Sequence, residues 1–225
     1  MGESTSDFLV HRFPPAIAVL GGGVVFALAL AWQLRAPRFR VVTYWFAVAM
    51  VSVFGTMCAD VMHVGLGVAY LVSSSVFVAA LAVIFLWWYR CERTLSIHSI
   101  VTTRRELFYW AAVTATFALG TAVGDMTATT LHLGYFSSGV VFGVLITLPA
   151  LAYGLTHLSA IGTFWTGYIL TRPLGASFAD WMGVSHERGG LNWGPGNVAM
   201  MLGGAMVLMV AVLARRERGE RTSGT

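Results

Sequence analysis

The sequence predicts an all-α fold: a polytopic bundle of transmembrane helices assembled from parallel two-helix repeats. Three observations lead to this class. Hydrophobic residues make up 57% of the chain and charged residues only 11%, whereas soluble domains carry about 25% charged residues. Stretches of about 20 uncharged residues recur along the chain, and one pattern of Trp, Gly and Asp occurs three times. This composition excludes a soluble globular domain and a disordered chain.

The first half of the chain contains three predicted membrane helices, because about 20 apolar residues cross a hydrocarbon core of roughly 30 Å. Charged residues delimit the apolar stretches: the first lies between Arg12 and Arg35, and the third ends at Arg90. We expect helices over residues 14–34, 41–63 and 68–89. No pattern typical of a removable signal peptide precedes them.

The second half contains four more predicted helices. One apolar stretch begins after Glu106, and the last one ends at Arg215. Between them, residues 126–171 carry no charge and are long enough for about one and a half spans. We expect helices over residues 107–131, 135–156, 160–182 and 195–214.

The placement of the positive residues predicts the orientation in the membrane. All 14 are arginine, and most lie in residues 35–40, 90–105 and 215–221. The loops near residues 64–67 and 132–135 contain none. Because arginine-rich loops stay on the cytoplasmic side, we expect a multi-pass protein of the bacterial inner membrane, surrounded by lipid, with a cytoplasmic C-terminus.

An internal repeat underlies the predicted bundle. Three segments align without gaps, each with an aromatic–Trp pair, a Gly ten residues after the Trp and an Asp fifteen residues after it. The segments are residues 44–60, 109–125 and 164–180, with glycines Gly55, Gly120 and Gly175 and acids Asp60, Asp125 and Asp180. Helices with small residues accompany them, at 21–26, 73–78 and 137–142, and small residues let membrane helices approach closely. The unit is therefore a helical hairpin, and hairpin repeats keep one orientation in the membrane.

We expect one transmembrane domain over residues 1–225, divided into four repeats. The repeats are residues 1–36, 41–90, 106–157 and 160–216. In the first, Gly2–Glu3 matches Gly124–Asp125, so Glu3 is the counterpart of the three aspartates. The matching Trp would lie upstream of Met1. We therefore expect seven complete helices, a truncated first helix and a true start upstream of Met1.

Three strings are specific enough to compare with known families: TLSIHSIVTTRRELFYW (94–110), FALGTAVGD (117–125) and YILTRPLGASFAD (168–180). The chain resembles, over almost its whole length, a bacterial family of multispanning proteins that carry a four-times-repeated unit of unknown function. These are usually labelled uncharacterised membrane-anchored proteins. The resemblance implies eight helices in four repeats, which supports the truncated first helix, and it implies no substrate or activity.

The repeat acids are the first candidates for a functional site, since a charged carboxylate at mid-bilayer costs roughly 2.5–3.5 kcal/mol on insertion scales. Fifteen residues of helix place each Asp about 22 Å from its Trp, beyond the midplane toward the outer face. Each Asp could alternatively cap the outer turn. Because the repeat provides four equivalent acids, we expect a cation to be bound by Glu3, Asp60, Asp125 and Asp180.

Three more side chains lie close to these acids in the sequence. Asp7, His63 and His132 follow their repeat acids by four, three and seven residues, so each shares a helix face with its acid. Carboxylate with imidazole suits divalent transition metals and also proton relay. Each His could instead be an interfacial side chain bonded to a turn carbonyl. We interpret Asp7, His63 and His132 as candidate metal ligands.

Arg172 lies near the middle of a predicted helix, seven residues after Trp165, where only a partner or water makes it tolerable. We expect it to be the counter-charge of the repeat acids, paired with Asp125 or Asp180. The pair would be either purely structural or an internal cation that exchanges with a transported one. Together with Pro173, Arg172 is expected to break the helix.

These features favour an integral membrane transporter or channel for a cation, with a divalent metal ahead of the proton. The alternative is a non-transporting membrane sensor or a partner subunit of a larger complex, with the loop 90–106 as its surface. We expect no enzyme, because no Walker, HExxH or GxSxG motif occurs. We also expect no cofactor and no nucleic-acid partner. A homo-oligomer is possible on the sequence alone.

Overall fold

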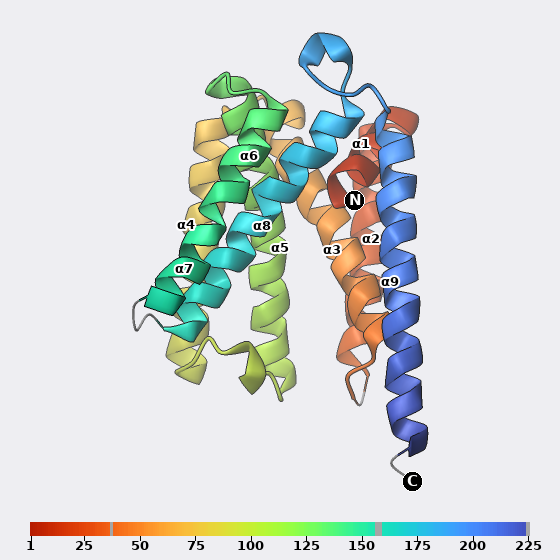
Figure 1. The fold of residues 1–225 in the computed structure, drawn as a ribbon, viewed down its shortest axis with the longest axis vertical. Helices are drawn as coiled ribbons and strands as arrows, with labels where there is room; N and C mark the ends of the chain where they lie inside the picture. The colour runs from red at the N-terminus through yellow and green to blue at the C-terminus, as the bar shows by residue number, and fades with distance from the viewer. Residues whose placement is uncertain (37, 156–158, 224–225) are drawn as a thin grey trace.

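The computed structural model describes residues 1–36, 38–155 and 159–223, and over these residues it consists of helices and connecting turns without a strand. The predicted all-α class is confirmed. Figure 1 shows the helices lying roughly along the long axis of the molecule. The α-helices are α1 (Gly2–Arg12), α2 (Pro15–Leu34), α3 (Val41–Asp60), α4 (Tyr70–Glu92), α5 (Thr103–Asp125), α6 (Tyr135–Leu145), α7 (Thr147–Leu155), α8 (Ala160–Gly183) and α9 (Pro195–Ser223).

Six of the described helices are long and apolar enough to cross a membrane, as expected of a multi-pass membrane protein. They are Pro15–Leu34, Val41–Gly65, Tyr70–Glu92, Thr103–Thr130, Tyr135–Leu155 and Pro195–Glu217. The helix predicted over 160–182 forms as α8, but it carries Arg172 and Asp180 and is not among the six. The helix predicted over 135–156 forms as α6 and α7; its predicted last residue lies outside the described residues.

The helices that carry the repeat acids form a closed inner ring. Here α1 packs against α3, α3 against α5, α5 against α8, and α8 against α1. The outer helices cover this ring: α2 packs on α3, α4 on α5, α6 on α8 and α9 on α1. Each outer helix therefore packs on the inner helix of the next repeat, and α9 returns to the first. In Figure 1 the short α1 lies beside the upper half of α9, in the place of an inner helix.

Two of the three repeat glycines lie where inner helices cross closely. A Cβ added at Gly55 would lie 2.6 Å from Cβ of Phe117 on α5, and a Cβ added at Gly120 would collide with Cβ of Arg172 on α8. No atom lies within 4 Å of a Cβ added at Gly175. The first two glycines are therefore required by the close approach of neighbouring helices, as small residues are in other membrane bundles.

The two ends of the bundle differ. At the lower end in Figure 1, which we call the arginine-rich end, the Glu92 carboxylate pairs with both Arg104 and Arg105. At the opposite acid end, α3 and α5 continue past Asp60 and Asp125 as π-helical turns, η1 (Val61–Gly65) and η3 (Met126–Thr130). A π-helical turn is rare and is frequently found at a functional site. Two repeats thus share a wide turn directly after the acid.

Candidate functional site

The inner ring brings the four repeat acids together, one from each inner helix. Glu3, Asp125 and Asp60 all act electrostatically on Asp180, and Asp7 of α1 does so as well. Glu3 and Asp180 are buried, each with 8% of its surface exposed. The acid cluster, as we call this group, consists of Glu3, Asp7, Asp60, Asp125 and Asp180.

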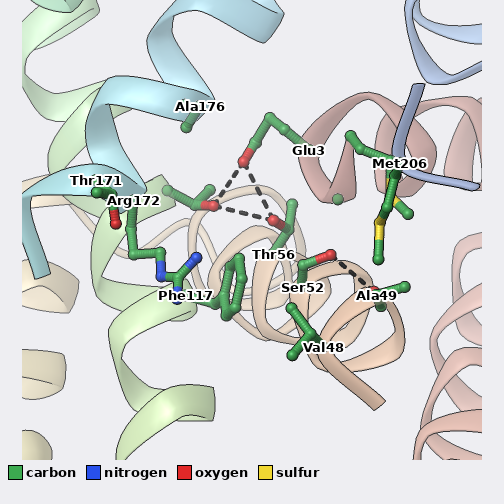
Figure 2. A pocket seen from close by; sticks show the side chains of 14 residues that line it. Glu3, Val48, Ala49, Ser52, Thr56, Phe117, Thr171, Arg172, Ala176 and Met206 are labelled. Atoms are coloured by element: carbon green, nitrogen blue, oxygen red, sulfur yellow. Dashed lines mark hydrogen bonds between the residues drawn. The ribbon is translucent and has the colours of Figure 1, made fainter. Parts of the chain in front are cut away.

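Glu3 is held by hydroxyl groups from two other repeats. Thr121 of α5 and Thr56 of α3 donate hydrogen bonds to its Oε2 atom, at 2.7 and 3.1 Å, and the two hydroxyls lie 3.1 Å apart. The Glu3 side chain points into a cavity of about 230 Å³, the Glu3 cavity, with Thr56 and Arg172 also on its wall (Figure 2). Both threonines are almost fully buried, so these bonds are shielded from water.

These threonines are repeat-equivalent positions, and our reading of the sequence missed them. Thr56 and Thr121 each follow the repeat glycine directly, and Ala176 takes this position in the third aligned segment. All three line the Glu3 cavity. The sequence contains a signal for them: in two repeats a Thr follows the repeat glycine and precedes the acid by four residues. A polar residue at a fixed repeat position inside an apolar helix indicates a buried polar contact.

Asp60 receives a hydrogen bond from the short helix α1. The Ser6 hydroxyl donates to its Oδ2 atom at 3.1 Å, and Ser6 is fully buried. Helix α1 therefore supplies an acid at Glu3 and a donor at Ser6 on the side that faces the ring. The spacing of three residues places both on one helix face.

Arg188 lies beside the acid cluster, and no sequence motif singles it out. It lies in the short helix η4 (His186–Arg188) at the acid end, and its Nη2 atom donates to the Tyr135 hydroxyl at 2.6 Å. Its charge acts on Asp7 and Asp125. Arg188 also lines a second cavity, of about 340 Å³, together with Asp7 and Asp180. An arginine outside the three arginine-rich segments was the available signal.

The two carboxyl groups of α1, which is not among the six spans, have raised pKa values. Burial raises the pKa of Glu3 to about 8, with further increases from Asp60 and Asp7, while the bonds from Thr121 and Thr56 lower it. Burial also raises the pKa of Asp7, against the opposing charges of His11 and Arg188. The environment of α1 therefore favours the protonated form of both side chains.

The candidate metal ligands are not gathered around one point. The His63 ring is buried, with Nδ1 within 3.2 Å of the Ser73 hydroxyl and its centroid 4.2 Å from that of Tyr70. His132 is exposed, in the left-handed conformation of the turn after η3. Within the described ranges, no three His, Cys, Asp or Glu side chains are arranged to hold a metal ion.

Arg172 lies against aromatic rings. Its guanidinium carbon is 4.0 Å from the ring centroid of Phe117 and 4.1 Å from that of Tyr168 (Figure 2 shows the Phe117 side). The expected ion pair with Asp125 or Asp180 does not form, because neither of these described carboxylates lies within 4.0 Å of the Arg172 guanidinium. The expected helix break does not occur either, because α8 runs through Pro173 to Gly183.

Comparison with known proteins identifies the repeats. A family model described as Repeat of Unknown Function (DUF347) matches residues 43–94, 108–158 and 163–219. The match covers the second, third and fourth predicted repeats, and the first predicted repeat, residues 1–36, stays a prediction. No curated protein and no solved structure matches the chain significantly.

Proposed function

The chain belongs to the DUF347 repeat family, and we propose that it is a membrane transporter or channel for a cation, with the acid cluster as its ion-binding site. The proton is the first candidate for the ion and a divalent metal the second. The observation that carries the proposal is the gathering of Glu3, Asp7, Asp60, Asp125 and Asp180 inside one ring of helices.

The charge balance of this cluster supports ion binding. Arg188, the Met1 amino group and His11 are the cationic groups near five carboxylates, so acids outnumber them. Carboxylates that share a poorly solvated site cannot all be ionised, because each negative charge destabilises the next. Some of them must therefore hold protons or bind a cation, and a change in that occupancy is the elementary step of ion transport.

The ligand set favours the proton over a divalent metal. A transition metal would combine carboxylate with imidazole, yet His63 is bound to Ser73 and His132 is exposed at the surface. The groups around Glu3 are instead hydroxyls, which can both donate and accept, as proton relays require. This reverses the order that we expected from the sequence.

We further propose the bacterial inner membrane as the location, with the arginine-rich end in the cytoplasm. The support is the concentration of arginine at the ends of α2, α4 and α9, because positive loops resist translocation. Ions would then reach the acid cluster from the outer face and leave through the arginine-rich end, or the reverse.

The experiment is an ion-flux measurement in proteoliposomes. An imposed gradient would be followed with an internal pH dye for protons, and with metal indicators for Mn²⁺ and Zn²⁺. The wild type is compared with the single variants Asp60→Asn, Asp125→Asn and Asp180→Asn. Glu187→Gln is the matched control, since this exposed carboxylate lies at the same end but outside the cluster.

Flux that is lost in the Asp variants and kept in Glu187→Gln would support the proposal and name the ion. Absence of flux for every ion, with all proteins eluting as folded species from gel filtration, would overturn it. The acids would then be caps of the outer turns, and the chain would be a sensor or a subunit of a larger complex.

A further inference from the structure

We propose that Arg172 is a charge barrier that slows the passage of hydrated cations between the Glu3 cavity and the arginine-rich end of the bundle. This inference deepens the proposed transport function and rests on it. It assigns to Arg172 a role in ion selectivity, in place of the ion pair expected from the sequence.

Arg172 contacts the linings of two separate cavities. The Glu3 cavity contains Phe117 and Arg172 in its wall. A second cavity, of about 740 Å³, opens at the arginine-rich end and is lined by aromatic residues, including Tyr168. We call it the aromatic cavity; its lining also includes Arg38, Tyr44, Glu106, Tyr109 and Trp110. The guanidinium of Arg172 contacts Phe117 of one cavity and Tyr168 of the other, so it lies between the two linings.

The position of Arg172 is tightly constrained. Helix α8 crosses α5 so closely at this point that a Cβ on Gly120 would meet both the side chain and the backbone of Arg172. The two ring contacts then fix the guanidinium, and its buried Nε atom has no hydrogen-bond partner. This charge is held by aromatic faces, and no carboxylate of the described residues lies within 4.0 Å of it, so no ion pair neutralises its repulsion of a passing cation.

The repeat shows that this charge is a departure from the common pattern. Arg172 lies seven residues after its Trp, and the equivalent residues are Ser52 on α3 and Phe117 on α5. Ser52, Phe117 and Arg172 all line the Glu3 cavity. One of three equivalent positions thus carries a charge, and a guanidinium stays charged at every physiological pH. A single side chain therefore sets the electrostatic barrier.

The test measures access to the Glu3 cavity and does not require transport. In a background with Cys58→Ala and Cys91→Ser, the variant Ala176→Cys places a thiol on the cavity wall. Two methanethiosulfonate reagents of similar size, one carrying a trimethylammonium and one a sulfonate, are added at the arginine-rich end of oriented vesicles. Their reaction rates are compared for Arg172, Arg172→Lys and Arg172→Gln, with Arg38→Gln as control for an exposed arginine of the aromatic cavity.

We expect Arg172→Gln to raise the rate of the cationic reagent by about tenfold or more, without a comparable gain for the anionic one. Arg172→Lys and Arg38→Gln should leave the ratio of the two rates near that of the parent. An unchanged ratio in Arg172→Gln would overturn the proposal. An equal rise for both reagents would also overturn it, because Arg172 would then only fill space. Failure of the flux experiment alone would leave this result standing, so the two proposals are tested separately.

Discussion

At the scale of single residues, Glu3 shows how the first repeat takes part in a site built mainly by the others. Its carboxylate comes from α1, while the hydroxyls that bind it come from α3 and α5. Such a bond between distant parts of the chain orders three helices at once. Without these donors the buried carboxyl group would be left unsatisfied, which costs about 1–3 kcal/mol.

Replacing Thr121 by Val should therefore weaken the fold. We expect Thr121→Val to lower the free energy of unfolding by about 1–2 kcal/mol, because the 2.7 Å bond to Glu3 is lost and no polar group replaces it. Thr116→Val is the matched control on the same helix, since the Thr116 hydroxyl bonds only the carbonyl of Val113 in its own helix. Tryptophan fluorescence during thermal unfolding in detergent measures both. Equal effects of the two variants would contradict the role given to Thr121.

The raised pKa of Glu3 makes a prediction for pH. The pKa of the Glu3 carboxyl is 4.5 in the unfolded chain and about 8 in the fold. Its contribution to stability is therefore complete below about pH 4.5 and is lost as the pH rises through about 8. We expect the melting temperature of the wild type to fall over this range more steeply than that of Glu3→Gln, which cannot ionise. Glu187→Gln, at an exposed site, should keep the wild-type slope. Parallel slopes for Glu3→Gln and wild type would contradict the shift.

Several residues of the site lay beyond prediction from the sequence. The acids were found because a carboxylate in an apolar helix is rare and this one recurs in register. Arg188 was not found, because a loop arginine has no periodicity and its approach to Asp125 depends on how η4 folds back. The prediction that Arg172 pairs with Asp125 or Asp180 was wrong for a related reason. A helical wheel shows which face a side chain occupies, but not which neighbouring helix supplies its contacts.

At the scale of elements, the repeat glycines have different roles although they look alike in the sequence. Gly55 and Gly120 lie at crossings between inner helices, and Gly175 has open space beside it. The reason is the order of the ring, because the helix after α8 is the short α1, which does not come within 4 Å of a Cβ added at Gly175. The repeat places a glycine at all three positions, and packing uses two of them for a close approach.

This difference is testable with one methyl group. Gly120→Ala should lower the free energy of unfolding by about 1–3 kcal/mol, because the new Cβ would force α5 away from Arg172 on α8. Gly175→Ala, at the equivalent position, should leave stability unchanged or raise it slightly, since Ala is the better helix former. The melting temperatures of the two variants in the same detergent provide the comparison. A larger loss for Gly175→Ala would show that α8 is packed differently.

At the scale of the whole molecule, the helices and their order along the chain could be predicted from the sequence. The packing of these helices into a closed ring could not. Apolar length and bounding charges were enough to place each span, because the bilayer thickness sets a length that few other constraints disturb. Which helix contacts which depends on side-chain packing between spans. Hydropathy therefore could not show that α9 returns to α1.

The orientation of the whole bundle has a direct measurement. A fluorescent protein fused after the C-terminus should fluoresce in bacterial cells, because the arginine-rich end is expected to stay in the cytoplasm. Alkaline phosphatase fused after residue 133, in the turn following η3, should be active, since that turn would face the periplasm. The reverse pattern would show the opposite orientation in the membrane, and the direction of the proposed ion path would be reversed as well.

The packing of α9 on α1 also bears on how the protein is made. During synthesis α1 emerges first and α9 last, so α1 waits for its outer partner until every other span has left the ribosome. Glu3 finds its donors Thr56 and Thr121 on helices made earlier, so these hydrogen bonds do not depend on α9. The last helix instead supplies the outer cover of α1. The covering layer of the ring is therefore completed only at the final step of biogenesis.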